Sequence, residues 1–345
     1  MKKLSFRVWL SIITFILIGL ILYASRKEIV QAWHLMKTVD LRILFVFILV
    51  SLVSYISAGE MIFSYLRKRG NIEHVSLWTL IRISIELNFV NHVLPSGGVS
   101  GISYVNWRLG KFGISAGKAT IAQVVRYFVG YIALTILLAI AVLAITIDGT
   151  VNRWIILLSS SLVFITVLFA IGVVYFFKDK SRMQKIEKKL IYFSNEFVKK
   201  ITFGRVDKAI RDNKLVNFFE DMRDDYLEIM QNKSLLKIPV LWGILFTVAE
   251  VALFWIVFWA LGSPINPAPI LIAYGLASLA GFIVVTPGGT GAYETIMVFV
   301  LAIAGMSSDA AIAGIVLTRI IILSITILVG WILYQQAVIK YGKRN

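Results

Sequence analysis

The sequence contains no cysteine, which excludes disulfide bonds, thiolate chemistry and cysteine-based metal sites. Its three histidines, His34, His74 and His92, are far apart in the chain and show no metal-ligand spacing. A phosphate-binding GxxxxGK[ST] loop is also missing, as are paired carboxylates that could share a soluble cleft. We therefore expect a protein that is not an enzyme and that uses no cofactor and no metal.

Charge is scarce as well: charged residues make up 16% of the 345 residues, whereas hydrophobic residues make up 59%. The apolar residues form runs of about 18 to 30 residues, the length that crosses about 30 Å of hydrocarbon as a helix. This pattern excludes an ordinary soluble domain. The net charge of +16 comes from Lys and Arg at the ends of these runs, where they set topology and anchor to anionic headgroups. Nucleic acid is therefore not expected as a partner.

Six apolar runs are long enough to be full spans, which predicts an all-α integral membrane protein with a single polytopic domain over residues 1–345. The first run resembles a signal peptide, but it is long and no A-x-A-like cleavage site follows it. We expect it to be a retained helix. The expected spans are residues 6–24, 43–66, 116–147, 152–177, 238–261 and 309–338.

Two further apolar regions, residues 76–112 and 269–305, are each interrupted in the middle by proline and glycine. The interruptions have the sequences LPSGGVSG at Leu94–Gly101 and TPGGTG at Thr286–Gly291. Proline removes a backbone donor and glycine lowers helix propensity, so each region should form two short helices joined by an irregular turn.

Basic segments predict the topology of the chain in the cell membrane. Residues 178–237 carry 15 Lys or Arg and 10 Asp or Glu at near-helical spacing, which predicts a basic cytoplasmic helical loop. Arg67–Arg69 and the two basic termini are expected on the same side, so both the amino and the carboxyl terminus should be cytoplasmic. The first interrupted region then enters and leaves on the cytoplasmic side, and the second on the outer side. They are predicted to be two oppositely oriented re-entrant hairpins.

The two hairpins and the helices that follow them form an internal repeat, with one unit at residues 76–147 and the other at 269–338. In each unit a proline is followed 18 residues later by Gly-x-Ser and 31 or 32 residues later by an arginine. An inverted repeat with broken helices is typical of a transporter whose site lies near the bilayer midplane. The matching positions are Pro95, Gly113–Ser115 and Arg126 in one unit, and Pro287, Gly305–Ser307 and Arg319 in the other.

Candidate binding residues are the charged groups at membrane depth and the glycines of the breaks. Arg126 and Arg319 stand too deep in their helices to reach the interface easily, so they either line a polar cavity or tie the carbonyls of a broken helix. Glu294 can pair with an arginine, carry a coupling proton or complement a helix dipole. New helix amino termini at the breaks would suit a phosphate or a carboxylate, which makes candidates of Gly97, Gly98, Gly288 and Gly289.

Other polar residues in the first interrupted region leave two interpretations open. Asn88 and Asn91 share a helical face and either bind a headgroup or join helices by hydrogen bonds. Arg108 faces either the site or the cytoplasmic interface. Arg82 and Glu86 are four residues apart and can neutralise one another on one helix face.

The paired motifs resemble the flippase-like transmembrane domain of lysylphosphatidylglycerol synthases and their stand-alone relatives. The likeness lies in Leu94–Gly98 (LPSGG) with Arg108 and Arg126, and in Thr286–Gly291 (TPGGTG) with Glu294 and Arg319; it extends over nearly the whole chain. In that family the membrane part is credited with moving an aminoacylated phospholipid to the outer leaflet, and two-domain members add a cytosolic synthase. Since the sequence ends at Asn345, soon after the last span, the resemblance implies lipid translocation without lipid synthesis.

The expected function is a flippase or scramblase for a lipid whose phosphate is held by Arg126, Arg319 and the helix amino termini of the breaks. Membrane lipids with phosphate headgroups are the expected partners, with a homo-oligomer as a further possibility. Two other functions remain open. One is a transporter of a small solute, and the other is a non-catalytic subunit of a lipid-modification or lipid-glycan pathway, docked to a separate lipid synthase or glycosyltransferase.

Overall fold

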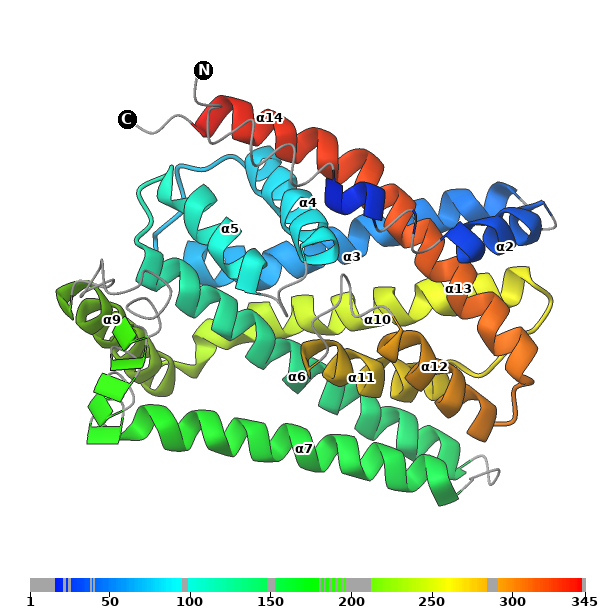
Figure 1. Cartoon of the computed structure of the whole chain (residues 1–345). Helices are drawn as coiled ribbons and strands as arrows, with labels where there is room; N and C mark the ends of the chain where they lie inside the picture. The colour runs from blue at the N-terminus through cyan, green and yellow to red at the C-terminus, as the bar shows by residue number, and fades with distance from the viewer. Residues whose placement is uncertain are drawn as a thin grey trace.

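The computed structural model is all-helical over the residues that it describes, which are 16–20, 23, 26–37, 39, 41–94, 99–147, 153–179, 212–283, 291–342 and scattered positions between 181 and 196. The helices run mostly along one direction and form an elongated bundle (Figure 1). Their bounds are α2 Arg26–Met36, α3 Leu41–Lys68, α4 Leu77–Val93, α5 Val99–Gly110, α6 Ala116–Ile147, α7 Arg153–Lys178, α9 Asp212–Gln231, η1 Lys233–Leu236, α10 Lys237–Ala260, α11 Pro267–Ile283, α12 Ala292–Ile303, α13 Ser308–Ile325, η3 Thr326–Gly330 and α14 Trp331–Tyr341.

Four helices are long and apolar enough to cross a membrane. They match the predicted spans 43–66, 116–147, 238–261 and 309–338 closely, so the protein is a multi-pass membrane protein. The predicted span 152–177 is the helix α7, of which Ile156–Leu168 is the apolar core within the described side chains. Most of the predicted span 6–24 lies outside the described residues.

The fourth long span combines α13, η3 and α14 into one continuous helix in which η3 is a π-helical segment. At the start of this segment the hydroxyls of Tyr55 and Thr326 are 2.5 Å apart and share a hydrogen bond. At its end, Gly330 lies directly on α4, since a Cβ atom at this position would stand 2.5 Å from the Cβ of Phe89. A π segment locally widens the helix, and here it is held at both ends by contacts with α3 and α4.

The two interrupted regions form two helical pairs, α4 with α5 and α11 with α12, and the members of each pair pack together. Lys68 at the end of α3 donates a hydrogen bond to the carbonyl oxygen of Ser234 just before α10, at 2.6 Å, so α3 ends where α10 begins. We call this end of the bundle the α9 end. The α4–α5 pair is connected to the α9 end, because short turns join it to the end of α3 and the start of α6. The α11–α12 pair is connected to the opposite end, where α10 ends and α13 begins (Figure 1).

The two Gly-x-Ser sequences have the same local structure. Gly113 and Gly305 both adopt a positive φ, of 80° and 94°, directly after α5 and α12. In both cases the next residue donates a backbone hydrogen bond to a carbonyl five residues earlier, which is the Schellman ending of a helix. The serine that follows accepts a hydrogen bond from a backbone N–H of the next helix: Ser115 from Lys118 at 3.3 Å and Ser307 from Ala310 at 3.4 Å. The repeated sequence therefore ends one helix and starts the next in the same way twice.

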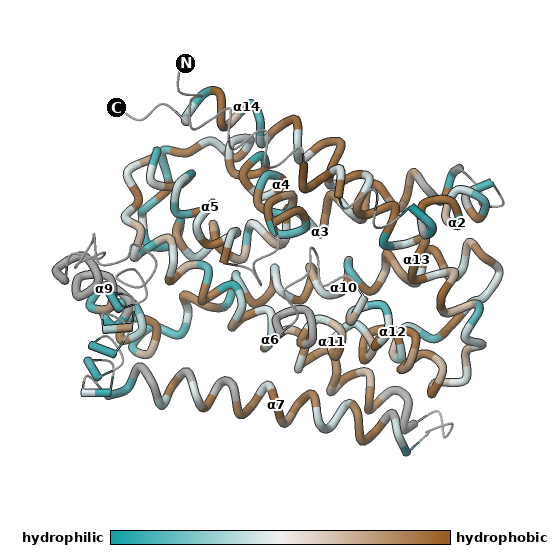
Figure 2. Tube along the Cα trace, in the orientation of Figure 1, coloured by the Kyte–Doolittle hydropathy of each residue, from teal (hydrophilic) through white to brown (hydrophobic). Residues whose placement is uncertain are grey.

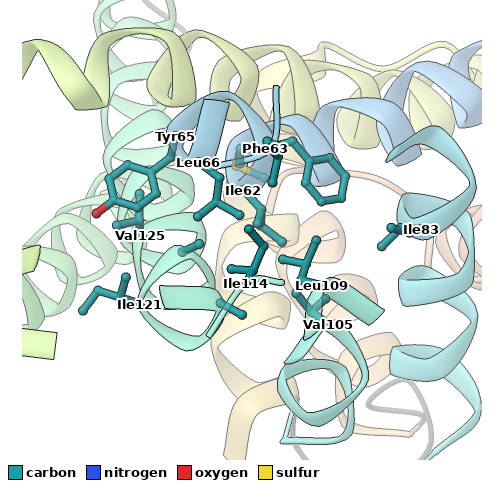
Figure 3. Close-up of a cluster of buried hydrophobic side chains, with 14 of the residues drawn as sticks. Ile62, Phe63, Tyr65, Leu66, Ile83, Val105, Leu109, Ile114, Ile121 and Val125 are labelled. Carbon is teal, nitrogen blue, oxygen red and sulfur yellow. The ribbon is translucent and has the colours of Figure 1, made fainter. Parts of the chain in front are cut away.

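Two apolar clusters surround the two helical pairs. The first joins α3, α4, α5 and α6 and includes Phe63, Ile83, Val105 and Val125 (Figure 3). The second joins α6, α7, α10, α11, α12 and α13. The helix α6 contributes to both clusters.

Within the predicted basic loop the structure describes the helix α9, which lies at one end of the bundle and carries both hydrophilic and hydrophobic residues (Figure 2). It is acidic, with six Asp or Glu and two Lys or Arg. Arg69 joins it to α3 through ion pairs with Asp225, at 2.6 Å, and with Glu228. Burial alone would lower the pKa of Arg69, but the hydrogen bond with Asp225 outweighs it and the pKa is raised, so this arginine keeps its charge. Basic residues of the loop gather in the part before α9.

Candidate functional site

The α4–α5 pair contains a fully buried ion pair. Arg108 of α5 donates from Nε to Glu86 of α4 at 2.8 Å, and the side chains of these two residues are 3% and 0% exposed. The Tyr104 hydroxyl donates to the same carboxylate oxygen at 2.7 Å. Arg108 also lies over the Tyr341 ring, at 4.6 Å from the centroid. Of the two positions predicted for Arg108, this contact with the last turn of α14 favours the one towards the α9 end.

The prediction that Arg82 and Glu86 neutralise one another was wrong. Glu86 pairs with Arg108, while Arg82 donates to the Gln336 side chain on α14 at 2.5 Å. Four-residue spacing places two side chains on the same face of a helix, but a buried carboxylate pairs with the cation that the neighbouring helix supplies.

The α11–α12 pair is joined to the helix that follows it by a second ion pair. Arg319 of α13 donates from Nε to Glu294 of α12 at 2.9 Å, and their side chains are 19% and 22% exposed. The other carboxylate oxygen of Glu294 accepts the backbone N–H of Gly291 at 2.6 Å. Gly291 has φ of +94°, a conformation that side chains rarely adopt, and α12 starts directly after it. Glu294 therefore both pairs with an arginine and caps a helix.

Arg126 lies ten residues into α6 and is 9% exposed. Its Nη1 atom is buried and makes no hydrogen bond, and no carboxylate among the described residues forms an ion pair with it. Its guanidinium lies 5.7 Å from the centroid of the Tyr127 ring. The two arginines that the repeat aligns thus differ, since Arg319 has a carboxylate partner and Arg126 has none in the described structure.

A further carboxylate lies within range of the charges of both arginines. Glu250, near the middle of α10, accepts a hydrogen bond from the Ser54 hydroxyl of α3 at 2.5 Å. It lies within electrostatic range of Arg126 and Arg319, and of the hydroxyls of Tyr274 and Tyr293. We refer to these groups together as the central cluster, which consists of Arg126, Glu250, Tyr274, Tyr293, Glu294 and Arg319.

The central cluster draws on helices that are distant in the sequence. Arg126 and Arg319 come from the helices that follow the two pairs, and Tyr274 and Glu294 come from the two arms of the second pair. No sequence motif surrounds Glu250, and no spacing in the sequence singles out Tyr274 or Tyr293. Tyr293 lies under the Arg319 guanidinium, at 4.6 Å from the ring centroid, a cation–π contact that sequence spacing does not reveal.

The two predicted asparagines of α4 lie at the border of this cluster. Asn88 donates to the carbonyl of Ser84 within its own helix at 3.0 Å. Asn91 packs against Gly101 of α5, where a Cβ atom would stand 2.1 Å from the Asn91 Oδ1 atom. That oxygen is buried and accepts no hydrogen bond, and the same is true of Oε1 of Gln123, one turn before Arg126. Buried oxygens that accept no hydrogen bond therefore lie on α4 and α6, and a buried guanidinium nitrogen that donates none lies on α6.

The predicted glycines Gly97, Gly98, Gly288 and Gly289 lie outside the described residues, as do Pro95 and Pro287. The helices α4 and α11 end at Val93 and Ile283, and α5 and α12 begin at Val99 and Ala292. Within the described part of the chain, no group of three or more His, Asp or Glu side chains could hold a metal ion.

Comparison with known proteins identifies related sequences. A family model described as the lysylphosphatidylglycerol synthase TM region matches residues 8–330. A protein of Methanothermobacter thermautotrophicus, named UPF0104 membrane protein, is 25% identical over 234 residues, which is 67% of each of the two chains. No solved structure matches the chain.

Proposed function

The chain belongs to the lysylphosphatidylglycerol synthase TM region family, and on that premise we propose that it moves a phosphate-containing lipid between the two leaflets as a flippase or scramblase. The lipid phosphate binds at the central cluster while the tails remain in the bilayer. This is a transport function without a chemical step, and no bond of the lipid is made or broken.

The proposal depends most on the burial of Arg126 without a carboxylate partner among the described residues. A charge in the middle of a span costs about 2.5–3.5 kcal/mol on insertion scales, so a buried arginine needs an anion or a polar cavity. Glu294 supplies the anion for Arg319, and Glu86 supplies it for Arg108. Arg126 lacks a carboxylate contact among the described residues, and a lipid phosphate offers a planar guanidinium two acceptors at once.

The surroundings of Arg126 favour a headgroup over a bare anion. Buried oxygens of Asn91 and Gln123 accept no hydrogen bond, so they can receive the hydroxyl or amine donors of a headgroup. The α12 amino terminus is less available to a phosphate, because Glu294 already accepts the Gly291 N–H. We therefore assign the phosphate primarily to Arg126, with Arg319 as the second cation and with Gly97, Gly98, Gly288 and Gly289 as backbone contacts at the breaks.

The two helical pairs fit re-entrant hairpins that enter from opposite sides of the membrane. The helices α5 and α12 have 12 residues each, about 18 Å of helix, which is too short for about 30 Å of hydrocarbon. The α4–α5 pair connects at the α9 end and the α11–α12 pair at the other end, as expected for the inverted units 76–147 and 269–338. In this proposal α9 and the basic residues of 178–237 lie in the cytoplasm, and both termini lie on the same side.

Leaflet exchange in proteoliposomes tests this function. We expect the full chain to exchange fluorescent phosphatidylglycerol, and Arg126→Ala to slow exchange by about thirtyfold or more, since loss of a buried charge contact costs about 2 kcal/mol or more. Arg126→Lys keeps the positive charge but cannot make two parallel hydrogen bonds to a phosphate, so its exchange rate should lie between those of the unmodified chain and Arg126→Ala. Arg182→Ala is the matched control, because this arginine is 40% exposed and pairs with Asp179 away from the cluster.

Three outcomes would count against the proposal. Exchange that is unchanged in Arg126→Ala would reject Arg126 as the phosphate site. Uptake of a soluble solute without lipid exchange would favour a small-solute transporter. Absence of exchange across a panel of phosphate-containing lipids, together with co-purification of a lipid synthase or glycosyltransferase, would favour the non-catalytic subunit.

A further inference from the structure

Glu250 is a buried carboxylate whose described contacts are unusual for a charged group. Its direct partner is the Ser54 hydroxyl, at 2.5 Å, and it forms no ion pair with a described cation. It lies near the middle of α10, which packs against α3, α6, α11 and α13. Carboxylates at this depth that lack a contacting cation are typical of proton pathways in transporters.

Each of the helices α3, α6, α11 and α13, which pack against α10, places a polar or charged group within electrostatic range of Glu250. Arg126 of α6 and Arg319 of α13 provide the positive charges. Tyr55 of α3, Tyr274 of α11 and Tyr293 of α12 provide neutral hydroxyls, and Ser54 provides the hydrogen bond. His92 of α4 is the other titratable side chain within range of the two arginines, and its Nδ1 atom lies 2.8 Å from the carbonyl oxygen of Asn88.

A metal ion does not suit this position. The described residues supply one carboxylate and one hydroxyl there, whereas Na⁺ or Ca²⁺ needs several oxygen ligands. Two arginines nearby would also repel a metal cation. A proton needs only the carboxylate oxygen, and it removes a charge from the membrane interior instead of adding one.

With Glu250 and Glu294 both ionised and no lipid bound, the charges of the central cluster are balanced. Two arginines and two glutamates cancel, and residues 95–98 and 284–290, which lie outside the described structure, contain no ionisable side chain. A phosphodiester would bring one negative charge into a region of low dielectric, where an unbalanced charge is costly. We propose that Glu250 takes up one proton when a monoanionic phosphodiester lipid binds, so that lipid and proton move together as a neutral unit.

This inference rests on the proposed function and adds the coupled ion and the substrate charge to it. Glu250 is the group suited to the proton, because Glu294 already holds both Arg319 and the Gly291 N–H. Electroneutral movement would make exchange independent of the membrane potential and dependent on the pH difference. By linkage, the proton also strengthens lipid binding as much as the lipid strengthens proton binding.

Proton uptake can be measured by titration calorimetry on the purified full chain, in two buffers whose ionisation enthalpies differ. The probe is dihexanoylphosphatidylglycerol, a soluble monoanion, and dihexanoylphosphatidylcholine is the control without net charge. We expect about one proton taken up per bound phosphatidylglycerol and none per phosphatidylcholine. Affinity for phosphatidylglycerol should fall by about tenfold per pH unit between about pH 6 and pH 8, the slope of one linked proton.

Variants locate the proton. Glu250→Gln imitates the protonated side chain, so it should bind phosphatidylglycerol without proton uptake and without pH dependence. Glu60→Gln is the matched control: Glu60 pairs with Arg67 at 3.0 Å, outside the cluster, and its replacement should leave the proton count and the pH slope unchanged. His92→Gln tests the other titratable group, and the pH slope should survive in it.

The outcomes separate the coupling from the function. Phosphatidylglycerol that binds and exchanges between leaflets without proton uptake would overturn the coupling and leave the translocator standing. A pH slope that persists in Glu250→Gln, or that disappears in His92→Gln, would overturn Glu250 as the proton site. Absence of binding and exchange by the unmodified chain would overturn the proposed function and the coupling with it. The measurement on the unmodified chain is decisive even if Glu250→Gln fails to fold.

Discussion

Each of the two helical pairs contributes a glutamate to an ion pair with an arginine, and these two ion pairs are built differently. Glu86 and Arg108 belong to the two arms of one pair, α4 and α5, and are 0% and 3% exposed. Glu294 and Arg319 join an arm of the other pair to the following helix, and are 22% and 19% exposed. The first ion pair fixes the two arms of α4–α5 to one another, whereas the second links α12 to α13 beside the proposed lipid site.

The difference in burial between the two ion pairs predicts different roles for the two helical pairs. A fully buried ion pair cannot be opened without leaving a charge in an apolar environment, so α4–α5 should move as a rigid unit. A partly exposed pair can exchange its partner at lower cost, so Arg319 can leave Glu294 for a lipid phosphate. Within the proposed function, α11–α12 is therefore the helical pair that we expect to respond to a lipid.

The largest effect should come from breaking the buried pair. Glu86→Gln leaves Arg108 buried without its carboxylate, and we expect the free energy of unfolding to fall by about 3–5 kcal/mol. Thermal unfolding in detergent, followed by tryptophan fluorescence, would measure it. Combining Glu86→Leu with Arg108→Met removes both charges and should restore most of the stability. A double variant as unstable as Glu86→Gln would contradict a role limited to charge balance.

An intermediate effect on stability is expected for the ion pair between Glu294 and Arg319. Glu294→Gln keeps an oxygen that can cap Gly291 but removes the charge facing Arg319. Because both side chains are partly exposed, unfolding free energy should fall by about 1 kcal/mol or less. Lipid exchange should change more than stability does, because Arg319 loses its resting partner. Loss of stability as large as that of Glu86→Gln would remove the distinction between the two pairs.

The smallest effect is expected at a surface pair that serves as the reference. Asp179 and Arg182 lie three residues apart and are 42% and 40% exposed. Asp179→Asn should change the unfolding free energy by about 0.5 kcal/mol or less and leave leaflet exchange unchanged. A clear effect on exchange would show that this part of the chain takes part in transport.

Helix positions were largely predictable from the sequence, whereas the pairing of charges was not. Long apolar runs predicted α3, α6, α10 and the helix formed by α13 to α14, because only a helix satisfies its own backbone in lipid. The Gly-x-Ser repeat predicted two equivalent boundaries, which have the same local hydrogen bonds. Arg82 and Glu86, by contrast, share a helix face without pairing, since each finds its partner on another helix.

The candidate site was predictable only in part. Arg126 and Arg319 were identified by their depth and by the repeat, and both act on Glu250 in the structure. Glu250 carries no motif, and it belongs to the site only because α10 packs against α3, α6 and α13. The different states of the two arginines also escaped prediction, because Glu294 has no counterpart in the first unit at the same distance from its proline.

The sequence by itself determined that this chain spans a membrane, where its long helices lie and which arginines stand deep within a helix, because hydrophobic length and charge spacing act locally along one helix. Tertiary structure alone decided which carboxylate neutralises which arginine, and that Arg126 has no described carboxylate partner while Glu250 lies within range of the charges of two arginines. The physical reason is that the energy of a buried charge depends on what the neighbouring helices place against it, and those helices are far away in the sequence.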